Sequence, residues 1–153
     1  DKITTNRKMA EAATDALGEF FRHASGRWTK TAPLPGGDFV NHDSLEIKMT
    51  TDFPWLDKAV ISRYVRTYGT SSYDILKGRS SMADLGVLFA GTLYQAEVEY
   101  LMAEEWAHTS EDILWWRTKQ GLYANEENVR ALDQFLMAHA TGDNGSSPLH
   151  QHA

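Results

Sequence analysis

The stretch AEEWAHTSEDILWWRTK, residues 103–119, decides how the fold is predicted. It holds four carboxylates, one histidine and three tryptophans in seventeen positions. Thr109, followed three residues later by Asp112, is typical of a helix N-terminus, because such side chains satisfy backbone N–H groups that have no partner within the helix. We therefore predict a junction between two helices, the first ending near Ala107 and the second running from Thr109 to about Gln120.

The same stretch offers a metal site as a competing interpretation. Glu105 and His108 have the Glu-x-x-His spacing of di-iron helical bundles, which places both side chains on one helix face. A di-iron bundle needs this motif twice, and none of the other five histidines has a glutamate three positions before it. We predict close helical packing here, with no metal bound.

Apolar residues recur at helical spacing over most of the C-terminal part. Pro54 is expected in a first helical turn, Thr92 with Gln95 as a capping box, and Asn125 as the cap of the last helix. The helices are predicted at about 54–68, 71–77, 92–107, 109–120 and 126–140.

The N-terminal part has a different pattern. Residues 6–22 form an amphipathic stripe, for which Thr4 or Thr5 is the expected cap. Residues 24–53 lack periodicity and are expected to be an extended linker loop, and residues 141–153 a flexible tail. No segment has the period of a strand. The predicted fold class is all-α: a bundle of about five helices at 54–140, preceded by one helix and a long loop.

Composition excludes several kinds of function. The chain has no cysteine, which rules out disulfides and thiolate chemistry, and it has no apolar run of the roughly 20 residues that span a membrane. Residues 80–153 carry three basic and eleven acidic side chains, so binding to nucleic acid is not expected. No dinucleotide fingerprint, phosphate-binding loop or nucleophile elbow is present. The opening DKITTNR lacks Met and a signal peptide, and we expect a piece of a longer protein.

A basic and aromatic group on the helix at 54–68 is a candidate docking surface. It consists of Arg63, Tyr64, Arg66 and Tyr68, and it would suit an acidic partner or an anionic ligand. The alternative is a helix with two solvated arginines and two packed tyrosines.

Four separated motifs in the chain form a recognisable pattern. They are KITTNR (2–7), RYVRTYG (63–69), DLG (84–86) and LYQAEVEYLMAEEWAHTSEDILWWRTKQGL (93–122). In this order they resemble the C-terminal part of the FAD-dependent glycerol-3-phosphate dehydrogenases, and the resemblance covers residues 2–140. It implies that residues 1–23 are the last segment of an α/β FAD-binding domain and that residues 54–140 form a helical cap domain. Residues 24–53 would be the loop that connects the two.

The resemblance also implies an activity for the whole enzyme. Members of that family oxidise sn-glycerol 3-phosphate to dihydroxyacetone phosphate with FAD and pass the electrons to quinone, while relatives use oxygen. The expected partners are the chain's own FAD-binding domain and, in a homodimer, a second copy. The expected place is the cytoplasmic side of a bacterial inner membrane, peripherally bound. This chain alone is expected to be inactive and to bind no FAD; a helical interaction module remains the alternative.

The resemblance places chemistry at the N-terminus. The family pattern is Gly-Gly-Lys-(Ile/Trp)-Thr-Thr-Tyr-Arg, so Lys2 matches a lysine at the substrate–flavin site, and Thr4 and Thr5 match threonines at the flavin pyrimidine edge. A helix N-terminus has unpaired N–H groups and partial positive charge, which would stabilise a reduced, anionic flavin. Asp1 and Asn6 depart from the pattern, and the role of the usual tyrosine does not carry over to Asn6.

Overall fold

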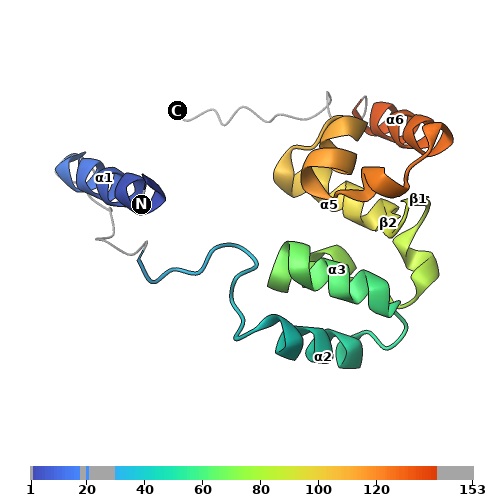
Figure 1. Cartoon of the computed structure of the whole chain (residues 1–153), viewed down its shortest axis with the longest axis horizontal. Helices are drawn as coiled ribbons and strands as arrows, with labels where there is room; N and C mark the ends of the chain where they lie inside the picture. Colours follow the sequence, from blue (N-terminus) through green and yellow to red (C-terminus); the bar gives the residue numbers. More distant parts are fainter. Residues whose placement is uncertain (1, 18–19, 21–29, 141–153) are drawn as a thin grey trace, which may run out of the picture. The chain divides into compact units, whose positions relative to one another are not determined.

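The computed structural model describes residues 2–17, 20 and 30–140. The chain divides into two units, Asp1–Asp38 and Phe39–Ala153, and each is described by itself (Figure 1). Both units are helical, and the larger one adds a very small two-stranded sheet. The predicted all-α class is confirmed, whereas the domain boundaries remain a prediction. The expected tail at 141–153 lies outside the described residues.

The smaller unit holds helix α1 (Lys2–Leu17), which carries an ion pair between Arg7 and Glu11 at 2.6 Å. The helix begins earlier than predicted. Thr4 and Thr5 lie within its first turn, so the expectation that one of them caps it is wrong. The end of the predicted helix, at 18–22, falls mostly outside the described residues.

Helix α2 (His42–Asp52) corrects the prediction of an extended loop at 24–53. Asn41 caps it, because its side-chain oxygen accepts the Ser44 N–H at 2.8 Å. Only Leu45 and Met49, one turn apart, are buried. A helix that buries one residue per turn leaves almost no periodic signal in its sequence, which explains why it was missed.

Helix α3 (Lys58–Tyr68) packs beside α2 (Figure 1) and buries one side, including Val60, Ile61 and Val65. Its start was predicted wrongly. Pro54 lies in a turn closed by a hydrogen bond from Leu56 N to Phe53 O at 3.0 Å. Proline is favoured at the second position of such a turn for the same reason that it suits a first helical turn, namely its fixed φ.

A run of short elements follows α3. These are η2 (Gly69–Ser71), α4 (Ser72–Leu76), η3 (Met82–Leu85), β1 (Leu88–Ala90) and β2 (Leu93–Tyr94). The two strands pair antiparallel, with Leu88 opposite Tyr94 and Ala90 opposite Leu93, so the expectation of no strand is wrong here. Gly91, at φ 53°, and Thr92 form the tight connection between the strands. The predicted helix start at Thr92 is also wrong.

The C-terminal part contains α5 (Gln95–Glu105), the π-helical turn η4 (Asp112–Arg117), the 3-10 turn η5 (Gln120–Tyr123) and α6 (Glu126–Ala140). Thr109 caps the segment before η4, since its hydroxyl accepts the Asp112 N–H at 3.1 Å. Asn125 caps α6 by accepting the Asn128 N–H at 2.9 Å. Both predicted caps are confirmed, although the second helix of the junction ends at Arg117 rather than near Gln120.

One apolar core holds the larger unit together. It is formed by buried side chains from α2, α3, α4, the hairpin, α5, η4 and α6, among them Met49, Ile61, Leu93, Leu101 and Leu132. No helix in the described ranges is long and apolar enough to cross a membrane.

Candidate functional site

The residues that the resemblance assigns to flavin and substrate lie at the start of α1. Lys2, Thr4 and Thr5 fall in its first turn, where the backbone N–H groups have no partner within the helix. This turn carries no acidic residue, so nothing in it opposes an anionic group. Unpaired N–H groups at a helix N-terminus are the kind of donor that an anionic or carbonyl-bearing ligand accepts.

The interior of the larger unit contains a second polar cluster, which joins α3 to α5. Glu97 is fully buried, and its carboxylate accepts two hydrogen bonds from Arg63: one from Nη1 at 2.7 Å and one from Nη2. The Tyr68 hydroxyl donates to the same carboxylate at 2.5 Å. A planar guanidinium matched to a carboxylate at two points fixes both distance and orientation. The cluster therefore fixes how these two helices meet.

The same guanidinium also binds the hairpin. Arg63 donates from Nε to the Thr92 hydroxyl at 2.6 Å and from Nη2 to the Thr92 carbonyl at 2.8 Å. Thr92 in turn donates its backbone N–H to Gln120 Oε1 at 2.9 Å. One chain of bonds thus runs from α3 through the hairpin to η5. These bonds use four of the five N–H donors of Arg63, which leaves at most one for an external anion.

Burial shifts the ionisation of the groups in this cluster. Burial and then the Glu97 charge raise the pKa of the Tyr64 and Tyr68 phenols well above their usual range. Burial lowers the pKa of Arg63, but the hydrogen bond and charge of Glu97 outweigh it, and the pKa is raised. The Tyr64 hydroxyl is buried with no hydrogen-bond partner in the described structure. All three groups hold one protonation state at ordinary pH.

The prediction that Arg63, Tyr64, Arg66 and Tyr68 form one exposed docking surface is therefore wrong. Tyr64 and Tyr68 are buried, and Arg63 is half-buried and pairs with Glu97. Of the four predicted docking residues only Arg66 is exposed. The roles of Glu97 and Gln120 were not predicted from the sequence, and Thr92 was predicted only as part of a capping box. For Glu97 a signal was present, because it stands one turn from Leu93 and from Leu101 and thus interrupts an apolar stripe with a charge.

Glu105, the carboxylate of the metal motif, has a protein partner. It accepts a hydrogen bond from Arg117 Nη1 at 2.5 Å, and Arg117 Nε binds Asp112 at 2.9 Å. These ion pairs tie the end of α5 to η4. Among the residues that the structure describes, no group of three potential metal ligands comes together.

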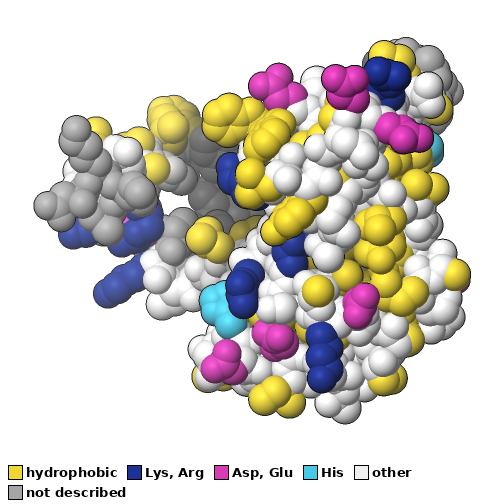
Figure 2. All heavy atoms as spheres, turned by 45° about the vertical axis from the view of Figure 1, so that its right-hand side comes forward, with side chains coloured by type: hydrophobic (Ala, Val, Ile, Leu, Met, Phe, Trp, Pro, Cys, Tyr) yellow, Lys and Arg dark blue, Asp and Glu magenta, His cyan; other side chains and the backbone are white. Residues whose placement is uncertain are grey.

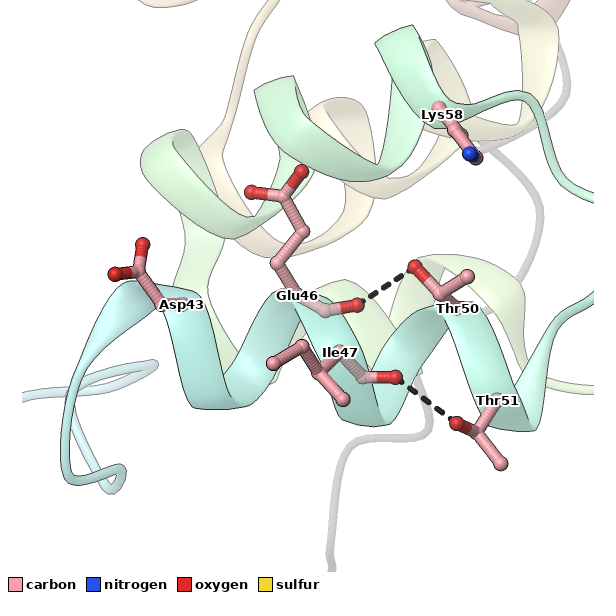
Figure 3. Close-up of a pocket in the computed structure, with 6 residues that line it drawn as sticks. All are labelled: Asp43, Glu46, Ile47, Thr50, Thr51 and Lys58. Carbon is pink, nitrogen blue, oxygen red and sulfur yellow. Dashed lines mark hydrogen bonds between the residues drawn. The ribbon is translucent and has the colours of Figure 1, made fainter.

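An open groove of about 490 Å³ lies along α2 (Figure 3). Its walls are Asp43, Glu46, Ile47, Thr50 and Thr51 of α2 and Lys58 of α3. Both threonine hydroxyls donate to carbonyls one turn earlier in their own helix, at 2.8 and 3.1 Å. The groove thus offers the exposed Asp43 carboxylate, the half-buried Glu46 carboxylate and the Lys58 ammonium, and this chemistry points to no ligand.

Comparison with known proteins decides the family. The model of the C-terminal domain of alpha-glycerophosphate oxidase matches residues 27–142. The chain belongs to this family. The match covers the whole larger unit as far as the structure describes it, including the Arg63–Glu97 cluster, while Lys2, Thr4 and Thr5 lie before it.

The names of individual relatives refer to two different substrates. Glycerol-3-phosphate dehydrogenase of Pseudomonas aeruginosa is 41% identical over 138 residues, which is 90% of this chain. Aerobic glycerol-3-phosphate dehydrogenase of Escherichia coli is 35% identical over 137 residues, or 89% of the chain. D-erythritol 1-phosphate dehydrogenase of Brucella abortus is 40% identical over 137 residues, or 88%. The chain spans only 27% of the length of each of these relatives.

Proposed function

We propose that this chain is the C-terminal helical part of an FAD-dependent glycerol-3-phosphate dehydrogenase. The full-length enzyme would oxidise sn-glycerol 3-phosphate to dihydroxyacetone phosphate and pass the electrons to quinone. The observation that carries the proposal is the family match over residues 27–142, together with relatives of that name at 41% and 35% identity. Because the chain spans about a quarter of their length, it is proposed to be inactive alone.

The role proposed for this chain's own residues rests on the first turn of α1. Bound FAD supplies the chemistry, since it accepts a hydride from the substrate carbon. Thr4 and Thr5 would donate hydrogen bonds to the flavin pyrimidine edge, and Lys2 would place positive charge beside the flavin or the substrate phosphate. The absence of acidic residues from this turn supports the assignment.

The quinone acceptor implies a location for the enzyme. Quinones dissolve in the lipid bilayer, so we propose that the enzyme lies on the cytoplasmic side of the inner membrane and is bound there peripherally. The membrane contact is assigned to the part of the polypeptide outside this chain, because residues 80–153 carry eleven acidic and three basic side chains, a balance that anionic lipids repel.

Two observations favour specific alternatives. D-erythritol 1-phosphate dehydrogenase is 40% identical, between the 41% and the 35% of the two relatives named for glycerol 3-phosphate, so a four-carbon polyol phosphate competes as substrate. The family description names an oxidase, so oxygen competes with quinone as acceptor.

Flavin reduction in the full-length enzyme separates these candidates. The enzyme is mixed without oxygen with either glycerol 3-phosphate or erythritol 1-phosphate, and loss of flavin absorbance is followed. We expect the three-carbon substrate to reduce the flavin with the higher kcat/KM, and the reduced enzyme to be reoxidised faster by a soluble quinone than by oxygen. Faster reduction by erythritol phosphate would reassign the substrate, and faster reoxidation by oxygen would reassign the acceptor.

The Lys2→Met variant tests the site itself. Removing a cation that stabilises developing negative charge is expected to lower kcat/KM by about a hundredfold. Lys8→Met is the matched control, because Lys8 is exposed on the same helix, one to two turns further on. Equal kcat/KM for the two variants would remove Lys2 from the proposed site.

A further inference from the structure

The junction between α5, η4 and η5 exposes an unusual amount of large apolar surface. Five side chains, here named the aromatic strip, carry it: Trp106, Trp115, Trp116, Leu122 and Tyr123. Trp106, Trp116 and Leu122 are each more than 70% exposed. Monomeric proteins rarely leave contiguous apolar patches open, and tryptophan and tyrosine are the residues most enriched at interfaces.

Local contacts hold individual members of the strip, or the segments that carry them, in place. The Trp115 ring lies against Gly121, where a Cβ atom would come within 2.5 Å of it. The Lys119 ammonium lies 5.7 Å from the centre of the Trp116 ring, and the Arg117–Glu105 ion pair holds η4 next to the end of α5, where Trp106 begins the connection. Figure 2 draws one face of the molecule and shows apolar side chains at the surface beside scattered charged ones.

Trp106 gives the clearest sign that the strip has a partner. Its N–H closes α5 by donating to the Leu101 carbonyl, and its backbone is left-handed, with φ 55° and ψ 39°. Glycine or asparagine adopts this conformation with little strain, whereas a tryptophan is strained there. The ring is also 80% exposed. The strained backbone at Trp106 and the exposure of its apolar ring both lower the stability of this unit. This indicates that the ring contacts something outside the unit.

The length of the relatives and the charge around the strip indicate which partner covers it. On the proposed function, about three-quarters of the polypeptide lies outside this chain, since the relatives are matched over only 27% of their length. A covalently linked partner has an effective concentration in the millimolar range for a short linker, which favours it over any separate molecule. The exposed carboxylates of Glu104, Glu111 and Glu126 lie within four residues of the strip along the chain and disfavour an anionic lipid surface or a nucleic acid.

We propose that the aromatic strip docks this helical unit onto the remaining, catalytic part of its own polypeptide. The complementary surface is apolar, with acceptors for the indole N–H groups and basic side chains opposite the three carboxylates. This deepens the proposed function and rests on it, and it replaces the α3 surface that the sequence suggested.

Hydroxyl-radical footprinting of the unaltered protein tests the proposal. Oxidation of Trp106 and Trp116 is compared between the full-length protein and the 153-residue chain, with Met137, 70% exposed on α6, as the internal control. We expect severalfold slower oxidation of both tryptophans in the full-length protein and equal oxidation of Met137. Equal oxidation of the tryptophans in both proteins would overturn the proposal.

Two further outcomes identify a different occupant and would also overturn it. Protection that already occurs in the 153-residue chain and increases with its concentration would assign the strip to a second copy. Protection that requires anionic lipid vesicles would assign it to a membrane. The result is independent of flavin reduction, so a protein that shows a protected strip but no reduction by either polyol phosphate would lose the proposed function and keep the docking surface.

Variants of the full-length protein supply a second measurement. The double change Trp106→Asn/Trp116→Ser keeps a residue suited to the left-handed position, and it should raise the population of undocked protein about thirtyfold, the effect of losing one strong aromatic contact. Hydrogen exchange of amides in η4 and η5 reports this population. Met137→Ser is the matched control and should leave exchange there unchanged. No increase in exchange in the double variant would count against the proposal.

Discussion

Arg63 of α3 and Glu97 of α5, 34 positions apart, form a two-point ion pair inside the larger unit, and Tyr68 donates to the same carboxylate. Glu97 has no exposed surface, and the Arg63 side chain keeps only 14% of its own. Such a pair contributes little by itself relative to apolar packing, but removing one partner leaves a buried charge uncompensated. The pair therefore acts chiefly by specifying how the helices and the hairpin meet.

The first prediction concerns this pair. Glu97→Ala should lower the free energy of unfolding by about 3–5 kcal/mol, since Arg63 then stays buried without its counter-charge. Urea unfolding of the 153-residue chain measures the loss. Glu126→Ala is the control, because its pair with Arg130 is 91% and 75% exposed, and it should change stability by no more than about 0.5 kcal/mol. A loss below about 1 kcal/mol for Glu97→Ala would mean that water solvates Arg63.

Trp106 supplies the second prediction. Trp106→Gly in the 153-residue chain should raise the free energy of unfolding by about 1 kcal/mol, because glycine adopts the left-handed backbone without strain and the exposed ring contributes little. Thermal unfolding measures the gain. A loss of stability would show that the ring packs on this unit itself, and it would also weaken the docking proposal.

Two glycines with positive φ form a matched pair for the third prediction. At Gly91 (φ 53°) a Cβ atom would run into Gln120 Oε1 and the Tyr123 ring, whereas at Gly78 (φ 75°) it would meet nothing within 4 Å. Gly78→Ala should lower stability by about 1 kcal/mol, the backbone strain alone, and Gly91→Ala by about 1–3 kcal/mol more, from overpacking. Equal losses in urea unfolding would show that the hairpin connection adapts without strain.

The fourth prediction concerns Tyr73, whose hydroxyl donates to Asp52 Oδ2 at 2.7 Å. Burial first, and then this hydrogen bond, raise the pKa of Tyr73 from its usual value of 10 to about 12. Because the folded-state pKa is the higher one, the stabilisation is complete below pH 10 and is lost as the pH rises towards 12. Tyrosinate absorbance, compared with Tyr73→Phe, isolates the group.

Asp52→Asn tests the cause of that shift. It removes the charge that Tyr73 faces and should move the pKa of Tyr73 back towards its usual value, with Asp43→Asn, exposed on the same helix, as the control. An unchanged titration in Asp52→Asn would leave burial as the whole cause.

Two of the helix caps could be predicted from the sequence. Thr109 and Asn125 cap the segments that their spacing indicated, since a cap hydrogen bond is made within three residues and needs no distant partner. Helix α2 escaped prediction because it buries only Leu45 and Met49 and owes its packing to α3.

Thr92 shows the limit of local reasoning. Its spacing to Gln95 is that of a capping box, yet its hydroxyl accepts from Arg63, 29 positions away, and the chain makes a hairpin turn there. A charged hydrogen bond from another helix is stronger than a neutral cap.

The helical class, the caps at Thr109 and Asn125 and the family follow from the sequence alone, because periodicity, capping and motif order are properties of neighbouring residues. Only the tertiary structure decided which polar side chains are buried. It turned Arg63, Tyr64 and Tyr68 inward towards Glu97 and left Trp106 and Trp116 exposed. The physical reason is that a buried charge is stable only when it is paired with an opposite charge. Arg63 finds that charge in Glu97, which lies far along the chain.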